Sequence, residues 1–471
     1  MHSSASSAST TSRRMIPAEM MDQLQSRFAE RCSLALSVRQ QHGRDESVFD
    51  IDPPDVVVFA ESTEDVVFVV SLAARHKVPV IPYGAGSSLE GHLLALEGGV
   101  SLDVSRMNQI LNINAEDLTV TVQPGVTREQ LNEALRHDGL FFPIDPGANA
   151  SIGGMTATRA SGTNAVRYGS MRENVLKLSV VSASGDIIHT GTRAKKSSAG
   201  YDMTRLFVGS EGTLGVITEI TLRLYPLPEA ISAAVCSFPS IEAAVRTTIA
   251  AIQMGIPLSR CEFMDVNAVT AVNRAEHLDL QLSPLLLMEF AGSPSAVREQ
   301  AQTMAEIAEE HGGQHFNWAE QPEDRSRLWK ARHRAYLSGL KLRPGCRAIT
   351  TDVCVPISRL ADCVLETIAE ANASGIPYFV VGHVGDGNFH MCYLLDPNNP
   401  QELEIGEQLN HHVVQRAIRM EGTCSGEHGV GLHKQAFLIE ETGASAVAMM
   451  RSIKHALDPD NIMNPGKVFT W

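Results

Sequence analysis

The segment His383–His390, with the sequence His-Val-Gly-Asp-Gly-Asn-Phe-His, constrains the fold more than any other stretch of this chain. An Asp-Gly pair in such a run is a strong signal for a two-residue hairpin turn. A turn at Asp386-Gly387 places residue 385 opposite 388, 384 opposite 389, and His383 opposite His390. Opposed residues lie on the same face of the ribbon, with Cβ atoms about 4.5–5.5 Å apart. The sequence therefore predicts an antiparallel hairpin carrying two adjacent imidazoles.

Two adjacent imidazoles and one carboxylate make a three-ligand site for a divalent metal, with positions left open for a substrate. Glu427, in the motif Ser425-Gly-Glu-His-Gly-Val-Gly431, is the candidate carboxylate. The predicted metal ligands are thus His383, His390 and Glu427, and zinc, manganese and iron all suit such a set. The alternative is that these histidines only satisfy structural hydrogen bonds.

His428 directly follows the candidate carboxylate ligand. An imidazole titrates near neutral pH, so His428 is the predicted general base beside the metal. The alternative is that it only holds a substrate carboxylate. In either role it indicates that the site acts on a small anion.

Length and charge limit the classes of protein to which the chain can belong. At 471 residues it is too long for one ordinary core, so two or three domains are expected. A net charge of −15 argues against binding to nucleic acid or to anionic lipid. No apolar run approaches the roughly 18 residues of a transmembrane helix. The eight cysteines show no paired spacing, which is typical of reduced thiols in an intracellular protein.

Residues 1–47 are expected to form an N-terminal tail and helix. The first 14 residues are rich in Ser and Thr, contain Arg13 and Arg14, and have neither an acidic residue nor an apolar core. They are therefore not a secretory signal. An organelle transit segment and a disordered tail preceding a start at Met15 remain alternatives.

Residues 48–228 alternate β-rich runs with Gly-rich turns and are predicted to form one domain. Helices are expected at 63–77 and 128–137, and Pro226 and Pro228 end the pattern. The predicted strands are 56–60, 78–82, 100–104, 118–123 and 216–224, with a hairpin formed by 177–183 and 186–190.

The pattern of predicted helices and strands changes beyond Pro228, and residues 229–425 are predicted to form a substrate-binding cap domain. Long amphipathic helices such as 295–311 and 358–373 separate strand-like segments, which favours an α+β domain built on an antiparallel sheet. The strand-like segments are 231–238, 258–264, 285–291 and 348–355. Helices then dominate, and residues 426–471 are expected to form a C-terminal helical segment that packs back at the active site. The predicted fold class of the whole chain is α+β.

Three blocks of small residues in the first domain indicate a large extended cofactor. The loop Gly84–Gly91 lets backbone N–H groups form a nest for a diphosphate, although it is neither a Rossmann fingerprint nor a P-loop. The block Asp145–Asn164 has too little bulk to pack a core, whereas a flat ligand along its backbone would explain it. The third block is Gly209–Gly215. The alternative is that all three are ordinary turns.

These blocks, together with Arg167-Tyr168-Gly169-Ser170, resemble the FAD-binding domain of the vanillyl-alcohol-oxidase (PCMH) type of flavoenzyme. The rest of the chain resembles the FAD-linked D-2-hydroxyacid dehydrogenases, and most of all the cytochrome-type D-lactate dehydrogenases. The motifs that carry this resemblance are Leu328-Trp-Lys-Ala-Arg-His333, Thr351-Asp-Val-Cys-Val-Pro356, the two histidine motifs and Asn464-Pro-Gly-Lys467.

The resemblance implies an FAD that is bound non-covalently. Ser87 stands where covalently flavinylated members have a histidine, although His92 nearby keeps a covalent link as an alternative. The residues implied to line the FAD are Gly84, Ala85, Gly86, Ser87, Ser88, Pro146, Gly147, Ser151, Gly153, Gly154, Ser161, Gly162, Ala165, Ile217 and Asn464.

The same resemblance implies oxidation of a D-2-hydroxy acid, D-lactate to pyruvate, by hydride transfer to flavin N5. Arg332 is implied to clamp the substrate carboxylate in a two-pronged contact, and Asn388 to touch the substrate. Tyr336 and Thr350 stand where hydroxyglutarate-oxidising relatives have extra cationic and hydroxyl groups, which favours a monocarboxylate.

Three other functions are alternatives to D-lactate oxidation. The chain could be a glycolate-oxidising FAD subunit of a larger complex, a D-2-hydroxyglutarate dehydrogenase, or a flavin-free metal-dependent hydrolase or regulator. The implied electron acceptor is cytochrome c, a quinone or an electron-transfer flavoprotein. The expected location is the cytoplasm or the surface of the inner membrane, and the mitochondrion in a eukaryote.

Overall fold

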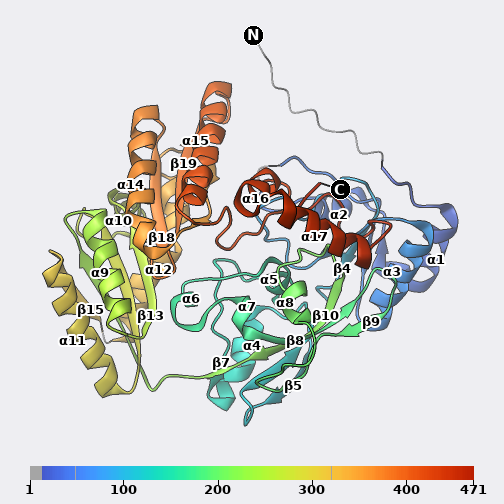
Figure 1. The fold of residues 1–471 in the computed structure, drawn as a ribbon, viewed down its shortest axis with the longest axis horizontal. Coiled ribbons are helices and arrows are strands. Elements are labelled where there is room, and N and C mark those ends of the chain that lie inside the picture. Colours follow the sequence, from blue (N-terminus) through green and yellow to red (C-terminus); the bar gives the residue numbers. More distant parts are fainter. Residues whose placement is uncertain (1–12, 48, 320, 471) are drawn as a thin grey trace.

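The computed structural model describes residues 13–47, 49–319 and 321–470, which form two α+β units joined near Leu227. The N-terminal unit lies on one side of the molecule and the cap on the other (Figure 1). Strand pairing is antiparallel in most of both units, so the predicted α+β class is confirmed.

The N-terminal unit begins with a four-stranded sheet of order β1-β2-β4-β3, in which β2, β4 and β3 are parallel. Helix α3 (Thr63–His76) makes the crossover from β2 to β3, and the Ser62 side chain caps its first turn by accepting from Asp65 N. Helices α1 (Ala18–Phe28) and α2 (Leu36–His42) precede it. The strands are β1 (Cys32–Ser33), β2 (Val56–Phe59), β3 (Val80–Tyr83) and β4 (Val100–Asp103).

A second, antiparallel sheet of order β5-β6-β10-β8-β9 completes this unit. Sequence patterning missed β5 because none of its side chains is buried and its apolar and polar residues do not alternate cleanly. Helix α4 (Arg128–Leu135) and the pair β7 (Leu140–Phe141) and β11 (Tyr225–Pro226) flank the sheet. Its strands are β5 (Ile110–Asn114), β6 (Thr119–Val122), β8 (Val175–Val181), β9 (Ile187–His189) and β10 (Val216–Arg223). Four short helices interrupt its loops: α5 (Ile152–Thr158), α6 (Ala165–Tyr168), α7 (Met171–Asn174) and α8 (Met203–Phe207).

The cap is one antiparallel sheet of order β15-β12-β14-β13-β18-β19-β16, with β17 also paired to β19. The predicted strand 348–355 is in fact two strands, broken at Thr351 and Asp352. The strands are β12 (Ala230–Ser237), β13 (Leu258–Met264), β14 (Leu285–Gly292), β15 (Gln314–Ala319), β16 (Arg347–Thr350), β17 (Val353–Cys354), β18 (Tyr378–His383) and β19 (Asn388–Leu395).

Helices cover both faces of the cap sheet. One face packs on α9 (Ile241–Gln253), α11 (Pro294–Glu310), α14 (Ile357–Ser374) and α15 (Pro400–Arg419). The other packs on α10 (Val266–Glu276), α12 (Pro322–His333) and α13 (Ala335–Leu340). Helices α12 and α13 are consecutive in the chain and meet at Arg334.

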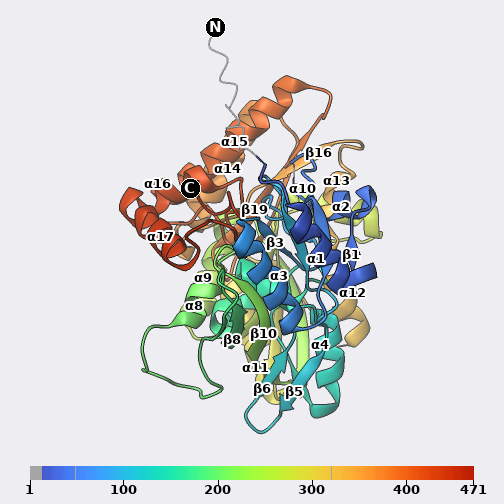
Figure 2. The same ribbon diagram turned by 90° about the vertical axis from the view of Figure 1, so that its right-hand side faces the viewer.

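The C-terminal segment returns from the cap to the N-terminal unit, with α16 (Gln435–Thr442) and α17 (Ala444–Leu457) lying against it (Figures 1 and 2). Val80 N donates to Ile462 O, and Asn464 N donates to Val80 O, so residues 462–464 extend the edge of β3. No helix within the described ranges is both long enough and apolar enough to cross a bilayer.

Candidate active site

Strands β18 and β19 form the predicted hairpin, but in a different register. His383 pairs with Asn388, Gly382 with Phe389, and Val381 with His390, so the predicted two-residue turn is wrong and the turn spans four residues. The shift is two residues, and side chains alternate with a period of two, so the two histidines remain on one face. Their ring centroids lie 5.5 Å apart.

Glu427 lies between the two histidines. Its Oε1 is 3.4 Å from His383 Nε2 and 3.4 Å from His390 Nε2. On the far side of each ring, His383 Nδ1 lies 2.7 Å from Glu262 Oε1, and His390 Nδ1 lies 3.0 Å from Thr351 O. Because both partners are acceptors, each Nδ1 carries a hydrogen, and Nε2 is the ring nitrogen that faces Glu427 and is placed to bind a metal.

This donor set fits a divalent metal. Ligand atoms about 2.1 Å from a tetrahedral zinc are about 3.4 Å apart, which matches both nitrogen–oxygen distances. Burial alone would raise the pKa of Glu427, but positive charge on His383 and His390 and their hydrogen bonds hold it well below its usual range, so the carboxylate is ionised. A divalent cation bound by the two Nε2 atoms and this carboxylate would supply that positive charge in place of protons on the imidazoles.

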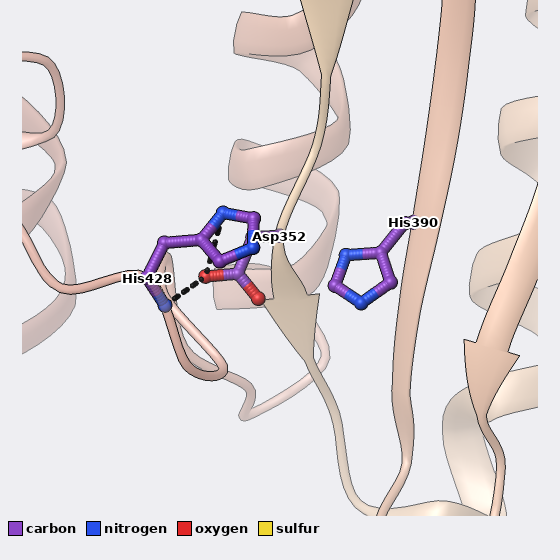
Figure 3. Close-up of side chains that lie close together, drawn as sticks. All are labelled: Asp352, His390 and His428. Carbon is purple, nitrogen blue, oxygen red and sulfur yellow. Dashed lines mark hydrogen bonds and ion pairs between the residues drawn. The ribbon is translucent and has the colours of Figure 1, made fainter. Parts of the chain in front are cut away.

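A second group, Asp352, His390 and His428, also brings three possible ligands together (Figure 3). The Asp352 carboxylate, however, already accepts from Ser425 Oγ, Lys434 Nζ and the backbone N–H of Glu427 and His428, at 2.9–3.2 Å. Through these contacts Asp352 holds the 425–428 loop in place. It is poorly suited to bind a metal, because its oxygen lone pairs already accept hydrogen bonds and the Lys434 cation lies against it.

His428 stacks on His390 with ring centroids 5.5 Å apart and planes 9° from parallel. Its Nδ1 lies 3.5 Å from Glu90 Oε1 and 3.7 Å from Asp352 Oδ2. Burial lowers the pKa of His428, but the two carboxylates outweigh burial and raise it. Glu90 belongs to the first small-residue loop, so the N-terminal unit contributes to the site.

Arg332 and Asn388, the predicted substrate residues, both lie in the cap near these groups. Arg332 Nη2 is 2.6 Å from Glu262 Oε2, and its Nε has no aligned hydrogen-bond partner among the described residues. Asn388 Nδ2 donates to Asp352 Oδ1 at 3.1 Å and to Val353 O at 2.8 Å. The Asn388 amide hydrogens are therefore used inside the protein, and only its Oδ1 is left for a ligand.

The first small-residue loop presents a run of backbone N–H donors. In the part of the chain that the structure describes, no protein atom accepts from the backbone N–H of any residue from Gly84 to Ser88. A Cβ on Gly84 would lie 2.5 Å from Ser151 Oγ, so the first two blocks touch. Ser151 caps α5 by accepting from Gly154 N. A run of free N–H groups beside a helix start suits a diphosphate.

The other predicted cofactor residues lie along the same blocks. Gly153 packs against Pro124, and Gly162 against Asp145, which by itself accounts for their lack of a side chain. Pro146, Gly147 and Ser161 lie in the loops around α5, with Gly147 exposed, while Ala165 begins α6 and Ile217 lies in β10.

Asn464 connects the first small-residue loop to the third through its side-chain amide. Its Nδ2 donates to Glu211 O at 2.8 Å and to His92 O at 3.2 Å, which connects the third block to the first. The Glu211 carboxylate lies 3.0 Å from His92 Nε2 and accepts from Val430 N and Gly431 N. The cofactor loops and the His428 loop are thus one connected structure.

Sequence reasoning missed the buried charges Glu90, Glu211, Glu262, Asp352 and Lys434. Two of them fall inside predicted strands: Glu262 lies within β13, and Asp352 lies between β16 and β17. A buried ion in a strand is costly unless it is paired, so a charge inside a predicted strand was the available signal. Their partners come from distant segments, and the sequence does not reveal them.

Comparisons with known proteins agree with this architecture. A family model described as "FAD binding domain" matches residues 54–191, and one described as "FAD linked oxidases, C-terminal domain" matches residues 227–468. The chain is 52% identical to "Probable D-lactate dehydrogenase, mitochondrial" of Danio rerio, over 93% of this chain and 89% of that protein.

It is 45% identical to "D-lactate dehydrogenase [cytochrome], mitochondrial" of Arabidopsis thaliana, over 97% of this chain and 81% of that protein. The solved structure of p-cresol methylhydroxylase has the same fold, with a TM-score of 0.77 at 16% identity over 98% of this chain and 99% of that one. The predicted PCMH-type fold is therefore confirmed. The chain belongs to the FAD-linked oxidases, as an FAD-dependent oxidoreductase with the C-terminal domain of that family.

Proposed function

We propose that this protein oxidises D-lactate to pyruvate with non-covalent FAD and a divalent metal bound by His383, His390 and Glu427. The observation that carries the proposal is the convergence of two imidazole Nε2 atoms and one carboxylate oxygen, with the His428 ring stacked beside them. Two relatives named as D-lactate dehydrogenases, at 52% and 45% identity, support the substrate.

When bound, the flavin supplies a two-electron acceptor and the metal a Lewis acid. Side chains of the protein remove the proton, bind the substrate carboxylate and orient the substrate. His428 directs Nδ1 at Glu90 and Asp352, which leaves Nε2 to take the hydroxyl proton. Arg332 holds the substrate carboxylate through its unpartnered Nε–H. Together they orient C2–H of the D-enantiomer towards the flavin.

Tyr336 and Thr350 support a substrate with a single carboxylate. The Tyr336 ring lies against Phe379, and Thr350 Oγ1 lies 3.6 Å from Cys392 Sγ. Neither residue carries a charge that would stabilise a second carboxylate, so D-2-hydroxyglutarate is expected to react poorly.

The attachment of the flavin and the fate of its electrons complete the proposal. Ser87 offers no imidazole, and His92 is fully buried against Glu211, which supports non-covalent FAD. A cytochrome is the proposed acceptor, after the name of the Arabidopsis relative, with a quinone or an electron-transfer flavoprotein as alternatives. A mitochondrial location is proposed if the source is eukaryotic, after the names of both relatives.

Anaerobic flavin reduction tests the substrate. The purified, metal-loaded protein should bleach near 450 nm on addition of D-lactate and stay yellow with L-lactate. Faster reduction by glycolate or D-2-hydroxyglutarate than by D-lactate would overturn the substrate assignment. A colourless preparation would overturn the use of FAD.

A further inference from the structure

Glu262 is a fully buried ion within strand β13. It lies in β13 between Cys261 and Phe263, and its side chain is 0% exposed. Its two oxygens have two different partners: Oε1 lies 2.7 Å from His383 Nδ1, and Oε2 lies 2.6 Å from Arg332 Nη2. Its immediate neighbours along the strand, Cys261 and Phe263, are buried in the core, so these two partners provide the hydrogen bond and the ion pair that the buried carboxylate needs.

The sheet explains why these three residues meet. Phe263 of β13 pairs with Gly382 of β18, so in this antiparallel register Glu262 stands beside His383. Both point to the sheet face that α12 covers, since their alternate neighbours Met264 and Val381 pack in the core formed with that helix. Arg332 reaches the same carboxylate from α12.

Arg332 is fixed by its ion pair with Glu262, but not all of its N–H donors have a hydrogen-bond partner among the described residues. It is 9% exposed, and its Nε lacks a hydrogen-bond partner in the described parts of the chain. A buried N–H donor without an acceptor is destabilising, so an unused guanidinium donor in this position indicates an anionic ligand.

We propose that Glu262 is a positioning residue that couples metal binding to binding of the substrate carboxylate. Through Oε1 it fixes His383 in the tautomer whose Nε2 faces Glu427. Through Oε2 it fixes Arg332 so that Nε–H remains available to the substrate. This inference rests on the proposed function and adds to it a residue that touches neither the metal nor the substrate.

The substitution Glu262→Gln cannot keep both contacts, because a glutamine side chain has one acceptor oxygen and one donor nitrogen. The oxygen can accept from either His383 or Arg332, but the amide N–H then faces the remaining donor, and that contact is lost. Loss of an outer partner of a metal-ligating histidine typically costs about 10–100-fold in metal affinity. We expect that loss for Mn²⁺ in E262Q, measured by electron paramagnetic resonance, and a rise of about tenfold in KM for D-lactate in dye-linked assays.

Glu289→Gln is the matched control. Glu289 lies in the neighbouring strand β14, is also buried, and faces Arg260 at 3.6 Å; no described contact joins it to His383 or Arg332. E289Q should keep Mn²⁺ affinity and KM within about twofold of wild type while E262Q changes both.

A double-mutant cycle tests the coupling. R332Q should raise KM and leave Mn²⁺ affinity unchanged, and E262Q/R332Q should have the KM of R332Q with the weakened Mn²⁺ affinity of E262Q. If E262Q alone does not retain FAD, the double variant removes both charges of the buried pair and gives the same metal readout against R332Q.

Wild-type Mn²⁺ affinity in E262Q, or KM effects that add fully in the double variant, would overturn the inference while leaving the proposed function intact. Wild-type protein that neither binds Mn²⁺ nor is reduced by D-lactate would overturn both.

Discussion

Burying Asp352, Glu262 and Lys434 costs several kcal/mol for each ion unless each finds partners of opposite charge. Lys434 Nζ lies 2.9 Å from Glu90 and 3.1 Å from Asp352. Burial lowers the pKa of Lys434, but the two carboxylates outweigh burial and raise it above its usual value. Each ion therefore stays charged in the interior, and each charge orients a side chain at the site.

The substitution His383→Ala removes one proposed metal ligand without touching the cofactor loops. We expect metal affinity and turnover to fall by more than about 100-fold, because loss of an outer partner alone costs about 10–100-fold. The variant should retain FAD. Metal content by elemental analysis and the visible spectrum measure both.

His412→Ala is the control for this substitution. His412 pairs with Glu370 on the exposed side of α15, so metal content should be unchanged. Wild-type turnover in His383→Ala would remove the proposed site.

Helix starts and turns of the cap fix the elements that carry the site residues. Asp265 caps α10, accepting from Ala268 N, and also accepts from Val380 N of β18, so one carboxylate joins a helix to the site strand. The turn between β18 and β19 is fixed by Gly387, whose φ is +79° and whose O accepts from Val355 N. Both contacts determine where β18 presents His383.

Asp265 gives the cap an unusual pH dependence. Burial raises the pKa of Asp265 to about 6 from an ordinary 3.8. The folded state therefore keeps a proton that the unfolded chain releases, and this group lowers stability as pH rises from about 4 to about 6. Asp265→Asn cannot ionise, so relative to wild type it should gain about 2 kcal/mol between about pH 4.5 and about pH 7.5.

Thermal unfolding of both proteins at the two pH values measures this difference. If the stability of the Asp265→Asn variant relative to wild type does not change with pH, the buried carboxylate with a raised pKa is contradicted.

Gly387→Ala tests the turn. Alanine at a positive φ costs about 1–2 kcal/mol by itself, and its Cβ would also collide with Val355 O. Gly375→Ala at the end of α14 is the matched control, with a φ of +73° and no atom within 4 Å of the new Cβ. Gly375→Ala should cost about 1 kcal/mol and retain metal, while Gly387→Ala should cost more than about 3 kcal/mol and lose metal. Equal effects on melting temperature and metal content would contradict this account.

The junction between the two units brings cofactor loops and cap into one site. Arg260 of β13 donates to Asn164 Oδ1 at 3.0 Å and to Asp145 Oδ2 at 3.1 Å, and both acceptors belong to the second small-residue block. Arg167 of α6 donates to Pro257 O, Ser259 Oγ and Ala291 O of the cap. The proposed flavin position is thereby fixed relative to the strand that carries Glu262.

Arg260→Gln should loosen this junction. Breaking a largely buried ion pair leaves Asp145 without its cation and is expected to cost about 3 kcal/mol, together with weaker FAD retention. Arg246→Gln is the matched control, because its exposed i,i+4 pair with Glu242 should be worth no more than about 0.5 kcal/mol. Thermal unfolding and FAD content after gel filtration measure both variants. Similar losses in the two would contradict an interdomain role for Arg260.

Local sequence determined where most helices and strands lie in the chain, and which face of its strand each side chain occupies. The ranges of α3, β4 and β10 match their predicted ranges to within one residue, and the small-residue blocks lie in loops and short helices, as their composition indicates. His383 and His390 fall on one face whether the register is the predicted one or the observed one, because an error of two residues preserves alternation.

Only the tertiary structure decided the register and the partners. Val355 contacts the backbone of Gly387 and sets a four-residue turn, which local turn chemistry does not encode. Glu262, Asp352 and Lys434 meet their partners across dozens to hundreds of residues, and such pairing depends on how sheets and loops pack and not on neighbours in the chain. The sequence by itself determined which residues are candidates for the chemistry, and long-range packing decided how their charges are paired and which way they point.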